Sequence, residues 1–310
     1  MSKSEPASTL DQWTATDANG RTWEMEVVSC LLCGETSSSP AHTWQCPYPA
    51  IPMEFEIASC DSCGFKYTNP RLTENALAEY YTQASPYSGD EYHTLDEVRS
   101  RYEDFLGSLK DAGLSPGRML EIGCDKGQFL KIAQDRGFEV TGIDPSSSAE
   151  IAREKFGLDV TRGLFQTQPY EPDSFDAVIL LDVLEHVSQP LQCLQKIQSI
   201  LKPGGLLLVK VPNVRHEFGL YPRLRSAALG FGAHEHLSHF SQKTLAGAFQ
   251  RAGLDVTLWR GFLPLMVRGG LGGALWRLAS SCGSAVAPLW KSWPDYHVAL
   301  ISVARKPLQS

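Results

Sequence analysis

The stretch of sequence that decides the fold is residues 119–146, which reads MLEIGCDKGQFLKIAQDRGFEVTGIDPS. It begins with a short apolar run over 119–122, passes through a turn that contains Gly123 and Gly127, and continues with apolar residues at helical spacing. A second apolar run follows and ends in Asp144. This order of strand, glycine turn, helix, strand and acidic residue is typical of the first half of a doubly wound nucleotide-binding sheet.

The turn indicates which kind of nucleotide such a sheet binds. Pyrophosphate sites use Gly-x-Gly-x-x-Gly at a helix N-terminus, whereas this turn reads Glu121-x-Gly123-x-Asp125-x-Gly127. A glycine-poor turn with carboxylates on both sides favours a cationic nucleoside that has no phosphates. The carboxylate of Asp144 follows the second strand, where it can accept hydrogen bonds from ribose hydroxyls.

These residues resemble motif I of the class I S-adenosylmethionine-dependent methyltransferases, whose pattern is acid-x-Gly-x-Gly-x-Gly. Asp125 stands in the place of the middle glycine. The resemblance implies that Asp144 holds the ribose of S-adenosylmethionine. It also implies that the methyl donor is surrounded by four residues of the turn, namely Glu121, Gly123, Asp125 and Gly127. The alternative is a buried strand and turn without a ligand.

Later segments continue the resemblance in the expected order. Gly163-Leu164-Phe165 occupies the place that contacts the adenine ring in the family, so Leu164 and Phe165 are expected to stack on it. A continuous apolar run over 175–181 predicts a central parallel strand, and Asp182 after it is a further candidate for the donor site. Lys-Pro-Gly-Gly then precedes a Leu/Val strand. The ordered set predicts an α/β fold with a doubly wound, mostly parallel seven-stranded sheet (the Rossmann-like methyltransferase fold), whose edge is an antiparallel pair at 255–259 and 297–304.

The candidate catalytic residues lie in two histidine-containing segments. Glu185 and His186 follow the central strand at the sheet edge where ligands of open α/β sheets bind. His186 is therefore a candidate for orienting the substrate or for acting as a base; the alternative is a histidine that shapes the loop by bonding to backbone. The segment Glu235-His236-x-x-x-Phe-Ser resembles an element of nucleotide-deoxysugar C-methyltransferases in which the Glu-His pair faces the substrate. The resemblance makes His236 a base candidate, with Glu235 orienting it.

A metal site is the alternative for the second segment, because three histidines and a glutamate precede a helix there. Their spacing is not the His-Glu-x-x-His pattern of a helical zinc site, and the methyltransferase class needs no catalytic metal. The residues concerned are His234, Glu235, His236 and His239.

Two Cys-x-x-Cys-Gly segments near the N-terminus predict a zinc ribbon. Two such knuckles supply four thiolates, the ligand set of a closed tetrahedral structural Zn²⁺ site. The gap between the knuckles is long, so a β-hairpin is expected there; His42 and Cys46 inside it are alternative ligands or ordinary loop residues. A redox pair is the rival interpretation of each knuckle. The predicted zinc ligands are Cys30, Cys33, Cys60 and Cys63.

The chain around the second knuckle supports this organisation. Cys-x-x-Cys-Gly-x-x-Tyr-x-Asn-Pro-Arg-x-Thr over 60–73 resembles a sub-family of sugar and natural-product C- and O-methyltransferases in which a zinc ribbon precedes the methyltransferase domain. The ribbon is expected to act as a scaffold or a substrate lid. The tyrosines that follow, Tyr80, Tyr81 and Tyr87, are candidates for lining the acceptor cleft or for ordinary packing.

The domain organisation follows from these motifs. We expect a disordered tail at 1–22, the zinc ribbon at 23–72, a helical linker or substrate cover at 73–115 and the methyltransferase domain at 116–310. The domain contains a helical insertion at 262–295, rich in Gly, Ala, Leu and Trp, which offers a lid, a surface for a homodimer or a membrane-leaning helix.

Composition limits the class of protein. The chain has 310 residues and a net charge of −7, which argues against bulk electrostatic binding of nucleic acid. Residues 1–17 are polar, so no signal peptide is expected, and no transmembrane run is seen. Eight cysteines in such a chain indicate metal ligation and free thiols, and the cytosol as compartment.

The sequence therefore predicts an S-adenosylmethionine-dependent methyltransferase with a structural Zn²⁺. Its acceptor is expected to be a small molecule, a sugar or secondary-metabolite intermediate that is methylated on carbon or oxygen. Two alternatives remain open: a methyltransferase of RNA bases, and a zinc-ribbon binding or scaffold protein with a degenerate nucleotide fold.

Overall fold

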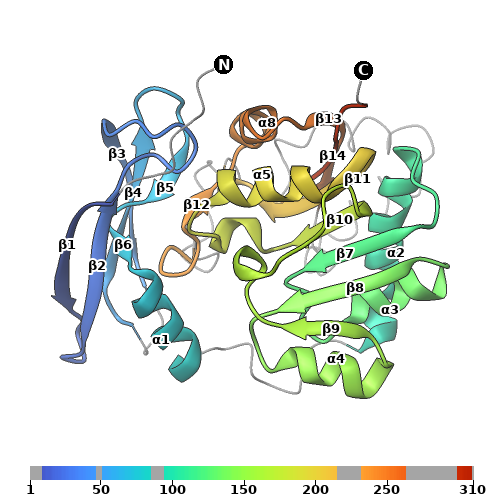
Figure 1. The fold of residues 1–310 in the computed structure, drawn as a ribbon. Helices are drawn as coiled ribbons and strands as arrows, with labels where there is room; N and C mark the ends of the chain where they lie inside the picture. Colours follow the sequence, from blue (N-terminus) through green and yellow to red (C-terminus); the bar gives the residue numbers. More distant parts are fainter. Residues whose placement is uncertain (1–8, 47–50, 85–93, 215–231, 263–298, 309–310) are drawn as a thin grey trace, which may run out of the picture.

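The computed structural model describes residues 9–46, 51–84, 94–214, 232–262 and 299–308. They form a large α/β unit with a smaller, all-β unit beside it (Figure 1). The insertion expected at 262–295 lies almost wholly outside the described residues. Among the residues described, no helix has the length and apolar character that crossing a bilayer requires.

A seven-stranded sheet is the centre of the α/β unit. Its strands are β7 (Arg118–Ile122), β8 (Glu139–Asp144), β9 (Asp159–Arg162), β10 (Phe175–Leu181), β11 (Leu201–Pro212), β13 (Asp255–Phe262) and β14 (Ala299–Arg305). They lie in the order β13-β14-β11-β10-β7-β8-β9. The pairs from β11 to β9 are parallel, and β14 is antiparallel to both of its neighbours. The predicted fold class, including the antiparallel edge, is confirmed.

The strands of this sheet are buried on both faces because side chains alternate along a strand. On β10, Val178 and Leu180 belong to one core cluster, and Ala177 and Ile179 belong to the other. This explains why the strand reads as an unbroken apolar run instead of an alternating one.

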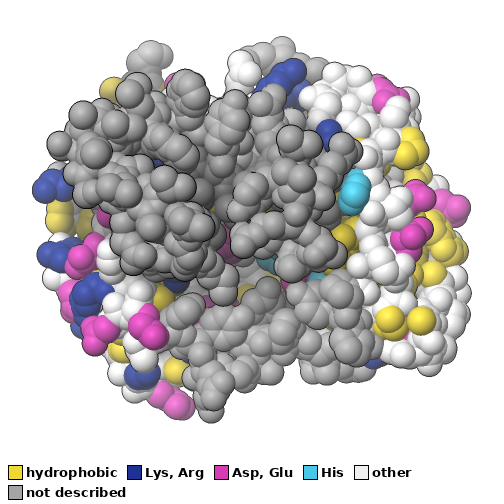
Figure 2. All heavy atoms as spheres, turned by 180° about the vertical axis from the view of Figure 1, so that it is seen from behind, with side chains coloured by type: hydrophobic (Ala, Val, Ile, Leu, Met, Phe, Trp, Pro, Cys, Tyr) yellow, Lys and Arg dark blue, Asp and Glu magenta, His cyan; other side chains and the backbone are white. Residues whose placement is uncertain are grey.

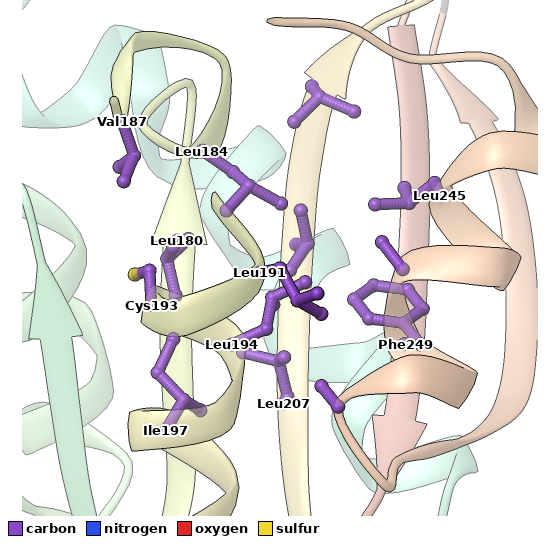
Figure 3. Packing of buried hydrophobic residues seen from close by; sticks show 14 of the residues in the cluster. Leu180, Leu184, Val187, Leu191, Cys193, Leu194, Ile197, Leu207, Leu245 and Phe249 are labelled. Carbon is purple, nitrogen blue, oxygen red and sulfur yellow. The ribbon is translucent and has the colours of Figure 1, made fainter. Parts of the chain in front are cut away.

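Helices on both sides cover the two faces, five of them within the described residues. The cluster that contains Val178 also contains the apolar faces of α5 (Pro190–Ile200) and α8 (Gln242–Arg251), and the opposite cluster contains those of α2 (Leu95–Asp111), α3 (Gln128–Asp135) and α4 (Ser148–Phe156). Leu191 and Leu194 of α5 lie between the strands and Phe249 of α8 (Figure 3).

The N-terminal unit is built from two small sheets. One has the order β1-β2-β6 and the other β12-β5-β4-β3. The strands are β1 (Thr9–Thr16), β2 (Thr22–Val28), β3 (Ser38–Gln45), β4 (Glu54–Cys60), β5 (Lys66–Thr68), β6 (Arg71–Leu72) and β12 (Ser238–His239). The antiparallel pair β3–β4 is the hairpin predicted between the two knuckles, and His42 lies on it as an exposed strand residue.

The disordered tail predicted for 1–22 is wrong from Thr9 onward. Residues 9–16 form β1, which pairs along the whole of β2 and whose residues are almost all exposed. A strand that buries so little has no hydrophobic alternation to reveal it, and its backbone pairing alone places it. Residues 1–8 lie outside the description.

The small unit, which we call the ribbon (residues 9–72 as described), shares a core with the α/β unit. Leu31, Leu32 and Phe65 belong to the same buried cluster as α5 and α8, and the rings of Phe65 and Phe240 lie 5.2 Å apart. The helix α1 (Glu74–Ala84) follows the ribbon, and the Thr73 hydroxyl caps it by accepting from the Ala76 N–H. The ribbon is therefore packed onto the α5/α8 face.

Candidate functional site

The four predicted zinc ligands converge in the ribbon. The sulfurs of Cys30 and Cys63 lie 3.6 Å apart, as do those of Cys33 and Cys60, and Cys33 and Cys63 are 3.5 Å apart. A tetrahedral ion with Zn–S bonds of about 2.3 Å spaces its sulfurs by about 3.8 Å. The thiols thus lie almost at the spacing that a Zn²⁺ ion requires.

The two knuckles also have the same backbone turn. Gly34 and Gly64 have φ of 74° and 71°, and each donates its N–H to the carbonyl of the first cysteine of its knuckle at 2.9 Å. A left-handed residue there needs glycine, because a Cβ is strained in that conformation. The donor set and the paired turns fit a structural zinc, and they make the redox interpretation of a single Cys-x-x-Cys pair less suitable.

The donor turn lies between β7 and α3, at the carboxyl ends of the parallel strands. Gly123 has φ of 71°, and a Cβ there would lie 2.4 Å from Val183 Cγ2, so this turn touches the loop that carries His186. Gly127 is also left-handed, but its missing Cβ makes room for Ala152 and Leu158. Gly123 therefore joins the two halves of the site, whereas Gly127 allows α3 to pack closely.

Asp125 adopts the left-handed backbone conformation that the middle glycine of the motif would adopt. Its φ is 46°, in the left-handed region that aspartate tolerates better than most residues. Its N–H donates to Asp144 Oδ2 at 2.9 Å, and Asp144 Oδ1 accepts from the Ser146 N–H at 2.8 Å. The buried Asp144 carboxylate thus ties the donor turn to the segment after β8.

Glu121 is the buried acid of the turn. Its side chain is 3% exposed, and its Oε2 has no hydrogen-bond partner among the described residues. Burial, with the charges of Asp144 and Asp125 in addition, holds the pKa of its carboxyl well above the usual range. A buried carboxyl with an open oxygen beside two further acids suits a ligand that carries positive charge, as S-adenosylmethionine does.

The expected adenine loop is 163–168. Leu164 is 54% exposed, whereas Phe165 is 3% exposed and lies in the core. The Lys196 ammonium stands 4.7 Å from the centre of the Phe165 ring. Of the two residues predicted to stack on adenine, only Leu164 presents its side chain outward.

The side chain of Lys196 also bonds to backbone carbonyls of this loop. Its Nζ donates to the carbonyls of Phe165 at 2.7 Å, Gln166 at 2.9 Å and Gln168 at 2.7 Å. An ammonium group has three donors, so this side chain is fully used.

We expect Lys196→Met to lower the affinity for S-adenosylmethionine and S-adenosylhomocysteine roughly 5- to 30-fold, the equivalent of about 1–2 kcal/mol. The loop loses its three ties while the apolar stem is kept. Isothermal calorimetry measures the change. Lys155→Met is the matched control, because Lys155 is an exposed residue of α4 whose ammonium lies over the Phe156 ring. An equal loss of affinity in both variants contradicts the role of Lys196 in holding the loop.

The two predicted imidazoles meet at the end of β10. His186 ends the short helix η3 (Leu184–His186), and its ring lies 4.7 Å from that of His236 in an edge-to-face arrangement. His186 Nδ1 lies 3.1 Å from the Glu235 carbonyl oxygen. Because a carbonyl only accepts, His186 carries its proton on Nδ1 and keeps Nε2 as an acceptor.

The environment of the pair separates the roles of the two rings. Burial lowers the pKa of His186 to about 4, so this ring is neutral at physiological pH and is a weak base. His236 is half-buried. His186 is thus suited to accept a hydrogen bond and orient a substrate, which leaves His236 as the better candidate for taking a proton.

Glu235 contacts the imidazole pair through its backbone. Its backbone carbonyl meets His186, and its side chain is 5% exposed. A carboxylate that lies within 4.8 Å of both imidazoles is that of Glu185, which the sequence placed with His186 at this sheet edge without a catalytic role. It is 1% exposed.

The other two histidines of the second segment face elsewhere. His234 Nε2 lies 2.9 Å from the Tyr80 hydroxyl, and its ring stacks on Trp44. His239 Nε2 lies 3.1 Å from Thr68 Oγ1. Among the described residues, the metal site weighed for 234–239 does not form. Tyr80 is 1% exposed and part of the packing, whereas the side chain of Tyr81 and all of Tyr87 lie outside the description.

Asp182 lies between the two parts of the site. It has φ of 56° and forms an ion pair with Lys210 of β11. The structure therefore shows Glu121, Asp125 and Asp144 at one turn, and Glu185, His186 and His236 at the next loop, with Asp182 and Val183 between them.

Comparison with known proteins agrees with this geometry. A family model described as "Methyltransferase domain" matches residues 94–258. The ubiquinone biosynthesis O-methyltransferase of Paracidovorax citrulli is 27% identical over 203 residues, 58% of this chain and 80% of that protein. The protein of the same name from Aeromonas salmonicida is 28% identical over 199 residues, covering 61% and 83%.

Among solved structures, the [4+2]-cyclase SpnF aligns with a TM-score of 0.51 at 22% identity, over 76% of this chain and 97% of that one. At that identity the likeness concerns the fold alone. The family model, by contrast, covers more than half of the chain and includes the donor turn and the loop of His186. The chain belongs to the family of proteins with a methyltransferase domain, whose methyl donor is S-adenosylmethionine.

Proposed function

We propose that the chain methylates a small molecule, a sugar or secondary-metabolite intermediate, with His236 removing the proton of the acceptor. The observation that carries the proposal is the His186–His236 pair beside the donor turn, with Val183 in contact with Gly123 between them. When bound, S-adenosylmethionine supplies an electrophilic methyl group whose sulfonium charge is lost on transfer. No strong electrophile is then needed from the protein.

The residues divide the remaining work. Glu121, Gly123, Asp125 and Gly127 with Asp144 form the donor side, together with Leu164 and Asp182. On the acceptor side, His186 orients the acceptor next to His236, and His236 accepts the proton. Alignment of the acceptor with the methyl group supplies much of the rate in such a displacement.

An oxygen acceptor is supported more than a carbon one. The curated relatives are named O-methyltransferases of ubiquinone biosynthesis. A hydroxyl carries a proton that must leave, which a neutral imidazole can take. Incubation of the chain with labelled donor and a metabolite extract, followed by mass spectrometry, identifies the acceptor; labelling of no small molecule contradicts this part of the proposal.

The RNA alternative finds less support. On the face that Figure 2 shows, the visible Lys and Arg side chains lie mostly near Asp and Glu side chains. An RNA-binding face predicts affinity that falls steeply with salt. A flat salt response removes that alternative.

Donor binding tests the enzyme interpretation directly. We expect calorimetry to show binding of S-adenosylmethionine coupled to proton release. The raised pKa of Glu121 increases the protonated fraction of its carboxyl in the free protein, and a cationic ligand favours the ionised form. Affinity should therefore rise with pH until the free carboxyl is ionised.

Two buffers of different ionisation enthalpy separate proton release from binding heat. Glu121→Gln is expected to bind more weakly and to release no proton, while the fold is unchanged. If neither S-adenosylmethionine nor S-adenosylhomocysteine binds at high micromolar concentration, the enzyme interpretation is wrong and the scaffold interpretation remains. Binding with equal proton release in wild type and variant assigns the proton to another group.

A further inference from the structure

The segment that carries His236 is attached to the ribbon by a short strand pair. β5 follows the second cysteine knuckle and lies between β4 and β12, pairing Tyr67 with Ser238 and Lys66 with His239. β12 begins two residues after His236. The ribbon sheet therefore continues directly into the peptide that bears the candidate base.

Thr68 makes the connection at the backbone that carries the His236 imidazole. Its hydroxyl donates to the His236 carbonyl oxygen at 2.8 Å, and its N–H donates to the Leu237 carbonyl at 3.1 Å. On the other side, the Leu237 N–H donates to the Glu185 carbonyl at 2.8 Å. The peptide that follows His236 is thus held between the ribbon and the loop of His186.

The hydroxyl of Thr68 has one proton, and the His236 carbonyl takes it. At His239 the same hydroxyl must then accept, so His239 carries its proton on Nε2. Thr68 is 0% exposed and His239 is 3% exposed, so water does not replace these bonds. The Thr68 side chain therefore fixes both the His236 carbonyl and the His239 ring.

A second residue of the ribbon holds the loop of His186. Arg71 is buried, and its Nε donates to Glu26 at 2.8 Å while Nη1 donates to the Ser188 carbonyl at 3.2 Å. The Ser188 hydroxyl in turn bonds to Glu74 of α1. The segment of each imidazole thus has its own tie to the N-terminal part of the chain.

We propose that Thr68 and Arg71 are positioning residues that set the distance and angle between the His236 and His186 rings. The ribbon would then act on catalysis through these two side chains, without contact with the reacting atoms. The inference rests on the proposed function for its catalytic consequence. The positioning itself can be observed without turnover.

The test compares Thr68→Val with Thr68→Ser in the full-length, zinc-loaded chain. Valine keeps the shape and loses the hydroxyl, whereas serine keeps it. We expect the valine variant to lower kcat roughly tenfold while leaving donor Kd and the acceptor KM unchanged, because misplacement of a reacting group affects the transition state most. Serine should restore the wild-type rate.

Histidine NMR with ¹³C at Cε1 supplies a readout that does not depend on an acceptor. The His236 and His239 signals, assigned with single His→Asn variants, are expected to shift in Thr68→Val. Ser302→Ala is the control, since Ser302 is a fully buried hydroxyl that donates to the Leu258 carbonyl in the edge strands. It should lose similar thermal stability with unchanged signals.

The outcomes separate the two levels of the argument. Unchanged His236 signals and kcat in Thr68→Val, or equal changes in Ser302→Ala, overturn the inference. Shifted signals in a protein that methylates nothing keep the positioning and reject the proposed function. If Thr68→Val does not fold, Arg71→Lys decides: it keeps a cation for Glu26, and the His186 signal should move; an unmoved His186 signal overturns the inference.

Discussion

Replacing His236 by alanine is expected to lower kcat by roughly 10²- to 10⁴-fold, the usual contribution of a general base. The affinity for S-adenosylmethionine should stay as in the wild type, because the donor turn at Gly123–Gly127 lies on another element. Formation of S-adenosylhomocysteine with the identified acceptor measures kcat, and isothermal calorimetry measures the donor affinity.

The controls for His236→Ala use other histidines of the chain. His42→Ala removes an exposed imidazole from β3 of the ribbon and should leave turnover unchanged. His186→Asn is expected to reduce kcat less than His236→Ala does, because burial already keeps His186 a weak, neutral base with a pKa of about 4. Unchanged turnover in His236→Ala places the base elsewhere, and a parallel loss of donor affinity makes the residue structural.

Cys60→Ser is expected to have the largest effect on stability. Structural zinc contributes on the order of 10 kcal/mol of binding free energy in small zinc domains, which is comparable to the whole stability of a typical domain. The wild type should hold about one zinc per chain, and the variant should lose it together with a large part of its thermal stability. Elemental mass spectrometry and thermal unfolding measure the two effects.

Cys193→Ala is the matched control, since Cys193 is also buried but lies on α5 and is not one of the four predicted zinc ligands. It should keep its zinc and lose only the cost of a small cavity, about 1 kcal/mol. Full zinc content in Cys60→Ser rejects the four-thiolate site. A second, separate equivalent of zinc that survives in Cys60→Ser would point to Glu185, His186 and His236 as its ligands.

The sequence predicted those parts of the fold that have a local signature. The strands next to the donor turn and the central strand at 175–181 read as apolar runs, and the paired knuckles indicated both the thiolate cluster and the hairpin between them. Each of these signals is contained within a few consecutive residues. The donor turn was recognisable for the same reason, although Asp125 replaces a glycine, because aspartate can adopt the same left-handed backbone.

The features that the sequence did not predict depend on distant parts of the chain. β12 has two residues, too few to show a period, and it pairs with a strand whose Thr68 is 168 residues from His236. Phe165 is buried in a core cluster formed with side chains of other strands and of α5. β1 is exposed along its length, so its place in a sheet leaves no trace in its hydropathy.

The strand β12 has a consequence for protein engineering. Because the fourth strand of the ribbon sheet comes from residues 238–239, the N-terminal unit is not a self-contained cassette. A chimera that exchanges only the first 72 residues would join a foreign β5 to a native β12. Recombination between such enzymes should therefore succeed only when both segments come from the same parent.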